Sequence, residues 1–245
     1  MERTLAWLRE ARFKPTNRIL AGLPQEALLT LRSHLRPVSL PRGRVLCEAD
    51  ERLTHVYFVE AGAVSLATVF EDGATAEMAT VGREGMVSIG ALLGAEDALG
   101  RYMVTLPGFA LAIEACRFQR ALGEDPKIRA ACEVYAQAFL ANLLQNVACN
   151  ASHTVEQRCA RSLLMCADQA EDDPFELTQE SLAQMLGVRR STVTVVACTL
   201  QSAGLIRYRR GRIAVVDRRG LEAVACQCYR IVREGYEGPL MRAVG

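Results

Sequence analysis

Short apolar runs alternate with turn residues between about residue 38 and residue 115. Glycines at positions 43, 62, 73, 82 and 108 separate the runs, and Glu71-Asp72-Gly73 has the composition of a hairpin turn. Runs of this length between turn residues are typical of β-strands in an antiparallel barrel or jelly roll. The pattern predicts at least six short strands, at 44–47, 56–59, 63–70, 74–81, 102–106 and 109–114.

Helical periodicity precedes this region. Residues 1 to about 35 are predicted to be helical, with Pro24 at a first helical position. The apolar stripe of this segment consists of Ala27, Leu28, Leu31 and Leu35.

A long helix is predicted from Asp125-Pro126 to about Asn150. Its apolar positions recur at spacings of 4, 3, 4, 4 and 3, which is typical of a coiled-coil seam. Because a long helix between two domains has little surface of its own chain to cover, we expect the seam to pair two copies of the chain. The alternative is a helix that packs on its own barrel. The seam residues are Ile128, Cys132, Tyr135, Phe139, Leu143 and Asn146.

Ser152-His153-Thr154 interrupts the helical pattern and is the expected hinge. Thr154 and Gln157 have the spacing of a capping box for a new helix, from Val155 to about Ala167. We therefore expect three parts. Residues 1–125 form helices and a barrel, 126–152 a dimerisation helix and hinge, and 153–245 a C-terminal domain.

The segment from Leu177 to Val216 predicts two helices joined by a tight turn at Gly187. Such a pair forms a helix-turn-helix, whose second helix enters the major groove of DNA. The outward face of the second helix carries Arg190, Ser191 and Thr194, which we expect to contact bases. The inner faces consist of Leu182, Met185 and Leu186 in the first helix and Val193, Val196, Ala197 and Leu200 in the second.

Two β-rich runs follow, at 206–209 and 212–216, on either side of Arg210-Gly211. They predict an arginine-tipped hairpin, or wing, beside the DNA groove. From this position we expect Arg210 and Arg212 to hold phosphates.

The net charge of the chain is only +1, but its distribution is uneven. Eight arginines and one acid, Asp217, lie between Gly187 and Arg219, whereas six acids and no base lie between Asp168 and Glu180. Arginine binds phosphates and base edges in a planar, bidentate manner. Helix-turn-helix spacing alone also occurs in helical bundles, but together with a wing and this basic block it predicts DNA binding.

The order of barrel, long helix, hinge and winged helix-turn-helix resembles the CRP/FNR family of bacterial transcription regulators over nearly the whole chain. The strongest similarity lies in LTQESLAQMLGVRRSTV, followed by LIRYRRGRI. The resemblance implies an α+β fold with a cyclic-nucleotide-binding-like jelly roll, a dimerisation helix and a winged helix-turn-helix. It also implies a homodimer that binds palindromic double-stranded DNA and contacts RNA polymerase.

The resemblance assigns roles to individual residues. It implies that Arg190 reads a base, and that phosphate contacts fall on Thr178, Gln179, Arg189 and Thr192. The chain departs from the cyclic-AMP-dependent members at two positions, because Ser191 and Val195 replace a glutamate and a second arginine. Serine and valine cannot reproduce that base readout, so the DNA site should differ.

The effector is expected to bind near Gly82, Glu84 and Gly85, where cyclic-nucleotide binders of the family hold the ribose in a Gly-Glu-Leu turn. Those members also carry an arginine about ten residues after the glutamate, which pairs with the cyclic phosphate. Here that position is Gly94, and the next arginine is Arg101. Without this bidentate partner, we do not expect cyclic AMP to bind in the usual manner.

Metal cofactors are not expected either. Iron–sulfur sensors of the family group cysteines near the N-terminus, but the first cysteine here is Cys47. Cys226 and Cys228 are assigned to core packing, in a helix from about Arg218 to Glu234. The three histidines, at 34, 55 and 153, are spread along the sequence and predict no ligand pair for haem or metal.

We predict a DNA-binding regulator gated by an unidentified effector, not an enzyme. One alternative is a ligand-independent regulator whose barrel only supports the dimer. Another is a cupin-like metalloenzyme, which would need clustered histidines that the sequence lacks. No stretch is long and apolar enough for a membrane span, and the N-terminus lacks a signal-peptide core, so a cytoplasmic protein is expected.

Overall fold

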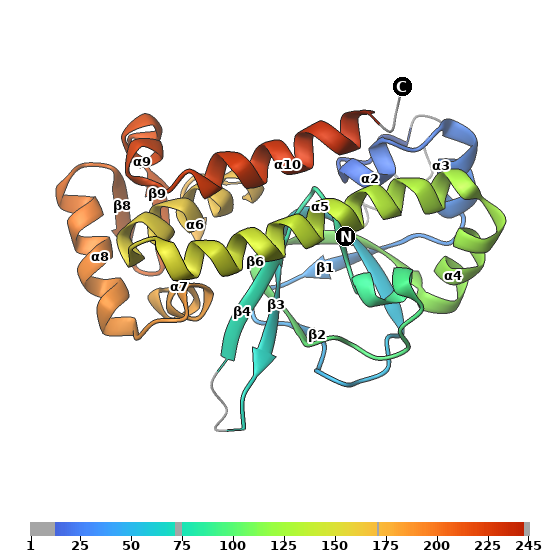
Figure 1. Cartoon of the computed structure of the whole chain (residues 1–245), viewed down its shortest axis with the longest axis horizontal. Coiled ribbons are helices and arrows are strands. Elements are labelled where there is room, and N and C mark those ends of the chain that lie inside the picture. The colour runs from blue at the N-terminus through green and yellow to red at the C-terminus, as the bar shows by residue number, and fades with distance from the viewer. Residues whose placement is uncertain (1–12, 72–74, 171, 243–245) are drawn as a thin grey trace.

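The computed structural model describes residues 13–71, 75–170 and 172–242. A β-sheet domain lies at one end and a mostly helical C-terminal domain at the other, and the long helix α5 runs along both (Figure 1). Within the described residues, none of the helices combines the length and hydrophobicity that a bilayer span requires.

The N-terminal domain is an antiparallel six-stranded sheet. Its central strands have the order β1-β6-β3-β4, with β2 paired to β6 and β5 paired to β3. Apolar residues of these strands form a common core. The strands are β1 (Arg36–Leu40), β2 (Val45–Cys47), β3 (His55–Val69), β4 (Thr75–Val81), β5 (Met86–Val87) and β6 (Arg101–Glu114).

Two pairs of predicted strands are single long strands. The runs at 56–59 and 63–70 form β3, and the runs at 102–106 and 109–114 form β6. Gly62, which was interpreted as a turn, has φ +81° and marks a bulge where the β3–β6 register shifts. A Cβ on Gly62 would lie 2.5 Å from the Leu106 carbonyl oxygen, so β3 can approach β6 this closely only with glycine at this position. The predicted hairpin pairing of β3 with β4 is confirmed, although its turn at 72–74 lies outside the described residues.

The helices of this domain are α2 (Arg18–Ala21), α3 (Gln25–Arg32), the 3-10 helix η1 (Ile89–Leu93) and α4 (Ala115–Glu124). Pro24 precedes α3 as its N-cap and is not its first residue. Ala27, Leu31 and Leu35 are buried as the stripe predicted. The prediction of helix before residue 13 lies outside the described residues.

The long helix α5 (Pro126–Ser152) begins at Asp125, whose carboxylate accepts a hydrogen bond from the Lys127 N–H at 2.8 Å. His153 ends it, and α6 (Val155–Gln169) starts with the predicted capping box of Thr154 and Gln157. The C-terminal domain continues with β7 (Phe175–Glu176), α7 (Gln179–Leu186), α8 (Arg190–Ser202), β8 (Ile206–Arg209), β9 (Arg212–Val215), α9 (Arg218–Val224) and α10 (Cys228–Arg242).

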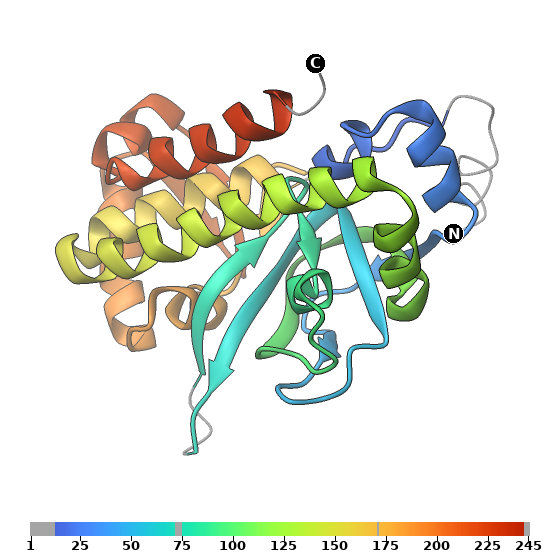
Figure 2. The same cartoon turned by 45° about the vertical axis from the view of Figure 1, so that its right-hand side comes forward.

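The predicted helix from 218 to 234 is two helices. The chain is extended at Ala225, so that α9 ends before the two cysteines and α10 begins at Cys228. After this break α10 returns along α5 toward the sheet domain (Figures 1 and 2).

The return of α10 overturns the assignment of the α5 seam to a dimer interface. Ile128, Cys132, Tyr135 and Phe139 are at most 4% exposed and belong to the core shared by the sheet, α5 and α10. Tyr135, for example, stacks on Tyr236 of α10, with ring centroids 6.2 Å apart. Leu143 packs partly against the same core, and Asn146 donates a hydrogen bond to the Met78 carbonyl at 3.0 Å. These side chains therefore contact their own chain.

Another face of α5 is apolar and exposed. Leu140, Leu144 and Val147 are 57%, 63% and 70% exposed, at spacings of 4 and 3. We call these three residues the α5 strip.

Candidate nucleic-acid interface and interdomain cavity

The turn between α7 and α8 follows the sequence prediction. Gly187 adopts φ +63°, a left-handed conformation that favours glycine and ends α7. Thr178 caps the other end of α7, since its Oγ1 accepts a hydrogen bond from the Ser181 N–H at 3.1 Å. The inner faces pack together through the buried side chains of Leu182, Leu186, Val193, Ala197 and Leu200.

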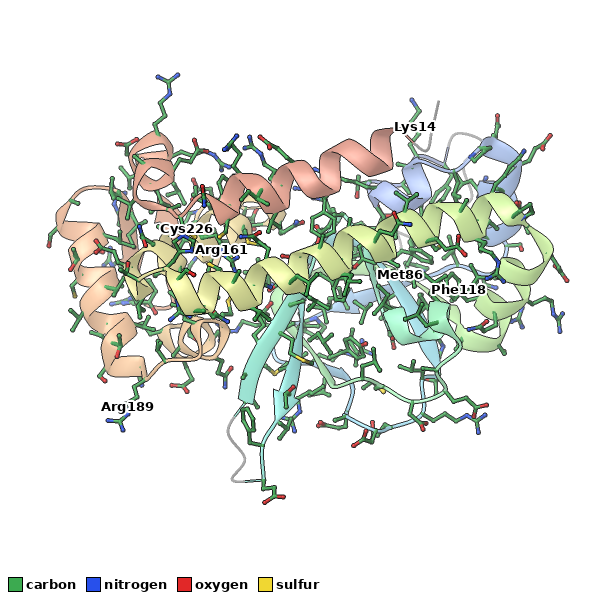
Figure 3. All side chains as sticks on the ribbon, viewed as in Figure 1. Lys14, Met86, Phe118, Arg161, Arg189 and Cys226 are labelled. Carbon is green, nitrogen blue, oxygen red and sulfur yellow. The ribbon has the colours of Figure 1, made fainter. Side chains whose placement is uncertain are left out.

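The opposite face of α8 is open to solvent. Arg190, Ser191 and Thr194 are all exposed, and Val195 beside them is 66% exposed. Arg189 is the N-cap of α8 and extends away from the body of the molecule (Figure 3). This face can therefore reach a macromolecular groove without rearrangement of α7 or α8.

The wing is a two-residue hairpin. Arg210 and Gly211 have φ of +51° and +77°, as in a type I′ turn. The Gly211 carbonyl accepts a hydrogen bond from the Leu177 N–H at 2.9 Å, which fixes the wing tip beside the start of α7. Arg212 donates to the Pro174 carbonyl at 2.7 Å, whereas the Arg210 side chain is exposed.

The wing and the two helices form one continuous surface. A Cβ on Gly211 would lie 3.8 Å from the Thr178 side chain, and Thr194 Oγ1 donates to Gln179 Oε1 at 2.9 Å. Thr178, Gln179 and Thr192 are partly buried within this surface. Among the described residues, ion pairs of the C-terminal domain involve Arg218 and Arg230, and none involves an arginine of α8 or the wing. The surface therefore keeps its positive charge.

The turn at 82–85 joins the sheet domain to the end of α6. Glu84 accepts hydrogen bonds from the Gly82 N–H at 2.7 Å and from the Gln169 side-chain amide at 2.6 Å. The Gln169 carbonyl oxygen in turn accepts from the Arg83 N–H at 3.0 Å. Burial raises the pKa of the Glu84 carboxyl despite these donors. We call this set of three hydrogen bonds the Gln169 bridge.

Both glycines of the turn have close neighbours. A Cβ on Gly82 would lie 2.2 Å from the Gln169 side-chain amide, and a Cβ on Gly85 would lie 2.2 Å from the Tyr135 ring. The turn thus touches α6 through Gly82 and α5 through Gly85.

Asp168 extends the junction toward α9 and α10. Its backbone carbonyl accepts a hydrogen bond from the Arg83 guanidinium, and its carboxylate pairs with Arg218. Tyr229 donates its hydroxyl to the same carboxylate at 2.8 Å. The last turn of α6 therefore contacts the sheet domain on one side and the C-terminal helices on the other.

A cavity of about 450 Å³ lies at this junction. Gly82 and Glu84, two of the three residues expected at the effector site, line it, whereas Gly85 is covered by Tyr135. Four arginines also line the cavity: Arg18, Arg83, Arg161 and Arg233. Arg101 lies elsewhere, where its Nε pairs with Glu48 at 2.6 Å.

The structure also brings together four residues that the sequence analysis kept apart: Cys149, His153, Cys226 and Cys228. No ligand pair was expected for the histidines, but His153 Nδ1 lies 3.6 Å from Cys228 Sγ. The sequence shows these residues only as two separate close pairs, because Cys149 and His153 are four residues apart and Cys226 and Cys228 are two apart. Their convergence depends on the return of α10.

Two family descriptions match separate parts of the chain. Residues 37–125 match the cyclic nucleotide-binding domain, and residues 157–224 match the Crp-like helix-turn-helix domain.

Several known proteins resemble the chain over most of its length. A "CRP-like cAMP-activated global transcriptional regulator" of Mycobacterium tuberculosis is 23% identical, over 81% of this chain and 92% of the relative. A CRP/FNR-family transcriptional regulator of Thermus thermophilus is 25% identical, with a TM-score of 0.63 over 78% of this chain and 98% of its own. FixK2 of Bradyrhizobium japonicum is 15% identical and has the same fold, with a TM-score of 0.65 over 78% of this chain and 98% of its own.

Proposed function

Because this chain belongs to the CRP/FNR family of transcription regulators, we propose that it is a homodimer that reads a palindromic DNA site under the control of an effector. The chain combines a cyclic-nucleotide-binding domain with a DNA-binding helix-turn-helix, and its relatives are regulators, not enzymes. As a regulator of transcription it would act beside the chromosome in the cytoplasm and contact RNA polymerase.

The exposed face of α8 supports the proposed base contacts. In this proposal Arg190, Ser191 and Thr194 read base edges from the major groove. Phosphates on either side are held by two groups of residues, Thr178, Gln179, Arg189 and Thr192 around the two helices, and Arg210 and Arg212 in the wing. The arginines without acidic partners supply the charge that such a surface needs.

The α5 strip supports the proposed homodimer. Leu140, Leu144 and Val147 follow the 4-3 spacing of a two-helix seam and are exposed in the single chain. Pairing of two α5 helices would cover these residues and relate the two copies of α8 by a two-fold axis.

The Gln169 bridge is the observation that supports control of DNA binding by an effector. The bridge holds α6, and with it the DNA-binding domain, against the turn that lines the cavity. Since α8 is exposed in this arrangement, the bridge does not cover the DNA-binding surface. Instead it fixes the position of α8 relative to α5, and so the distance between the two recognition helices of a dimer. A ligand that displaces Gln169 would release the domain to match the half-site spacing of DNA.

The cavity at the junction is the proposed effector site. Its four arginines face two acids, Glu84 and Asp168, which favours a small molecule with an anionic group. The Mycobacterium tuberculosis relative is cAMP-activated by name, but here no arginine follows Glu84 at the family's spacing and Tyr135 covers Gly85. We therefore propose an effector other than cyclic AMP bound in the usual manner. Calorimetry with cyclic AMP should give no micromolar isotherm, and such an isotherm would overturn this part of the proposal.

The variant Gln169→Ala tests effector control. It removes the two hydrogen bonds of Gln169 across the junction without touching the DNA-binding surface, so DNA affinity without effector should rise by roughly 5- to 150-fold, the usual range of allosteric coupling. Gln25→Ala, at an exposed glutamine of α3, is the control and should change nothing. If Gln169→Ala lowers thermal stability but leaves DNA affinity unchanged, the barrel is only a scaffold for the dimer.

A further inference from the structure

Four potential metal ligands converge where α5 ends and α10 begins. Cys149 and His153 come from the end of α5, and Cys226 and Cys228 from the first residues of α10 and the turn before it. The ligand atoms of all four lie within 4.8 Å of one another, and the three cysteines are buried. In the sequence the two pairs are separated by more than 70 residues. Figure 3 labels Cys226, which lies just before the start of α10.

The distances are close to those around a tetrahedral metal ion. Cys149 Sγ lies 3.5 Å from Cys226 Sγ, and Cys228 Sγ lies 3.6 Å from His153 Nδ1. Standard Zn–S and Zn–N bonds give edges of about 3.8 Å between two sulfurs and about 3.6 Å between sulfur and nitrogen. Three thiols and one imidazole are also a donor set of structural zinc sites. We propose that these four residues bind one Zn²⁺ ion per chain.

The surroundings suit a site with three thiolates. Zn²⁺ with three thiolates and a neutral imidazole carries one net negative charge, which a nearby cation would offset. Arg161 is that cation, since its guanidinium is close enough to interact electrostatically with the Cys149 side chain. Its Nε and Nη1 are buried and have no hydrogen-bond partner among the described residues.

Hydrogen bonds to sulfur add an outer shell. The Gln145 side-chain amide donates to Cys228 Sγ at 3.0 Å. A divalent cation bound here would deprotonate its thiol ligands.

Other uses of the cluster fit the geometry less well. A disulfide has an S–S length near 2.0 Å, far shorter than the 3.5 Å between Cys149 and Cys226, and would leave Cys228 and His153 unused. An iron–sulfur cluster places its iron atoms between the ligand sulfurs, and so holds them farther apart than the 4.8 Å limit found here. A single ion fits within that limit.

Four protein ligands would complete the coordination shell, so the zinc is structural and not catalytic. It would tie the hinge at His153 to the start of α10. Because α10 covers the inner face of α5 and lines the cavity, the ion would hold that cavity in shape. This inference does not depend on the proposed control of DNA binding.

The test is the metal content of the full-length chain, purified under reducing conditions and measured by inductively coupled plasma mass spectrometry. We expect one zinc per chain, and its loss in Cys226→Ser and Cys228→Ser. Cys132→Ser replaces an equally buried cysteine of α5 outside the cluster and should keep the metal. His153→Cys preserves four ligands and should also keep it.

Cobalt provides a readout that does not require any variant to fold. Co²⁺ added to metal-free wild-type protein should give the visible bands of a tetrahedral thiolate site, and added Zn²⁺ should abolish them. Iron with inorganic sulfide in the purified protein would overturn the proposal. So would a chain that binds neither zinc nor cobalt, or variants of Cys226 and Cys228 that retain the metal.

Discussion

Two arginines of the DNA-binding surface should have separable roles. Arg190 opens the exposed face of α8, whereas Arg210 sits at the wing tip. Arg190→Ala should cost about 1–3 kcal/mol at one base pair of each half-site and relax the preference there, because a bidentate arginine–guanine pair provides that discrimination. Binding curves on a site and its single-base variants measure this effect.

Arg210→Ala should instead weaken binding to all sequences alike. Loss of one phosphate contact should reduce the magnitude of the log–log salt slope by about 0.9. Titrations at several salt concentrations measure the slope. If Arg190→Ala also acts uniformly and leaves base preference unchanged, Arg190 is a phosphate clamp, and specificity comes from Ser191, Thr194 or DNA shape.

Gly85 tests the contact between the effector turn and α5. Gly85→Ala places a methyl group 2.2 Å from the Tyr135 ring, inside a closed core, and should lower the free energy of unfolding by about 1–3 kcal/mol. Gly123→Ala is the control, because that helical glycine has no neighbour within 4 Å and alanine should stabilise it by up to about 1 kcal/mol. Chemical denaturation compares them, and equal stabilities would mean that the turn does not press on Tyr135.

The sequence predicted the exposed face of α8 but not the convergence of Cys149 with Cys226, for a physical reason. Arg190, Ser191 and Thr194 share one helix face, and helical periodicity alone places them on the side away from Val193 and Leu200. Cys149 and Cys226 meet only because the chain breaks at Ala225 and α10 then returns along α5. No local spacing encodes such a long-range contact.

At the scale of elements, the pattern of α5 gave the correct helix but the wrong partner. The 4-3 spacing identifies an apolar face, yet it cannot say whether that face meets a second chain or the same one. Here the sheet domain and α10 cover Cys132, Tyr135 and Phe139, and of the large apolar side chains described in α5 only the α5 strip is left exposed. Similarly, Gly62 suggests a turn in the sequence but lies at a bulge, because glycine marks both turns and bulges.

The two faces of α5 predict different outcomes for charged substitutions. Leu140→Asp with Leu144→Asp should give folded monomers, since both side chains are exposed in the single chain. Phe139→Asp with Leu143→Asp should unfold the protein instead, because Phe139 is buried in the core. Sedimentation and circular dichroism distinguish these results. A dimer that survives the first double substitution would place the interface elsewhere.

Glu84 makes the junction sensitive to pH. Burial raises the pKa of its carboxyl above the unfolded value, so its contribution to stability is present below the unfolded pKa and is lost as pH rises through the raised, folded pKa. Glu84→Gln removes this dependence. Between the unfolded and the folded pKa of Glu84, the free energy of unfolding should therefore fall more steeply with pH in the wild type than in the variant. If the two pH curves are parallel, burial does not raise the pKa of the Glu84 carboxyl.

At the scale of the whole molecule, the two domains meet through few polar contacts. Gln169 and Asp168 bind the turn at 82–85, and Arg218 and Tyr229 bind Asp168 from the other side. The sequence predicted both domains because each has its own periodic core. It could not predict how they dock, because Gln169 and Asp168 carry no periodic pattern that distinguishes them from surface residues.

The measurement that tests the central claim most directly is selection of DNA from a random pool by the purified protein, followed by sequencing. A homodimer of this fold should enrich a two-fold palindrome with half-site centres about 10–10.5 base pairs apart. The same selection with Arg190→Ala should lose the preference at one base pair in each half-site. No enrichment over the starting pool, or an enriched sequence without two-fold symmetry, would contradict the assignment of this chain as a dimeric, sequence-specific regulator.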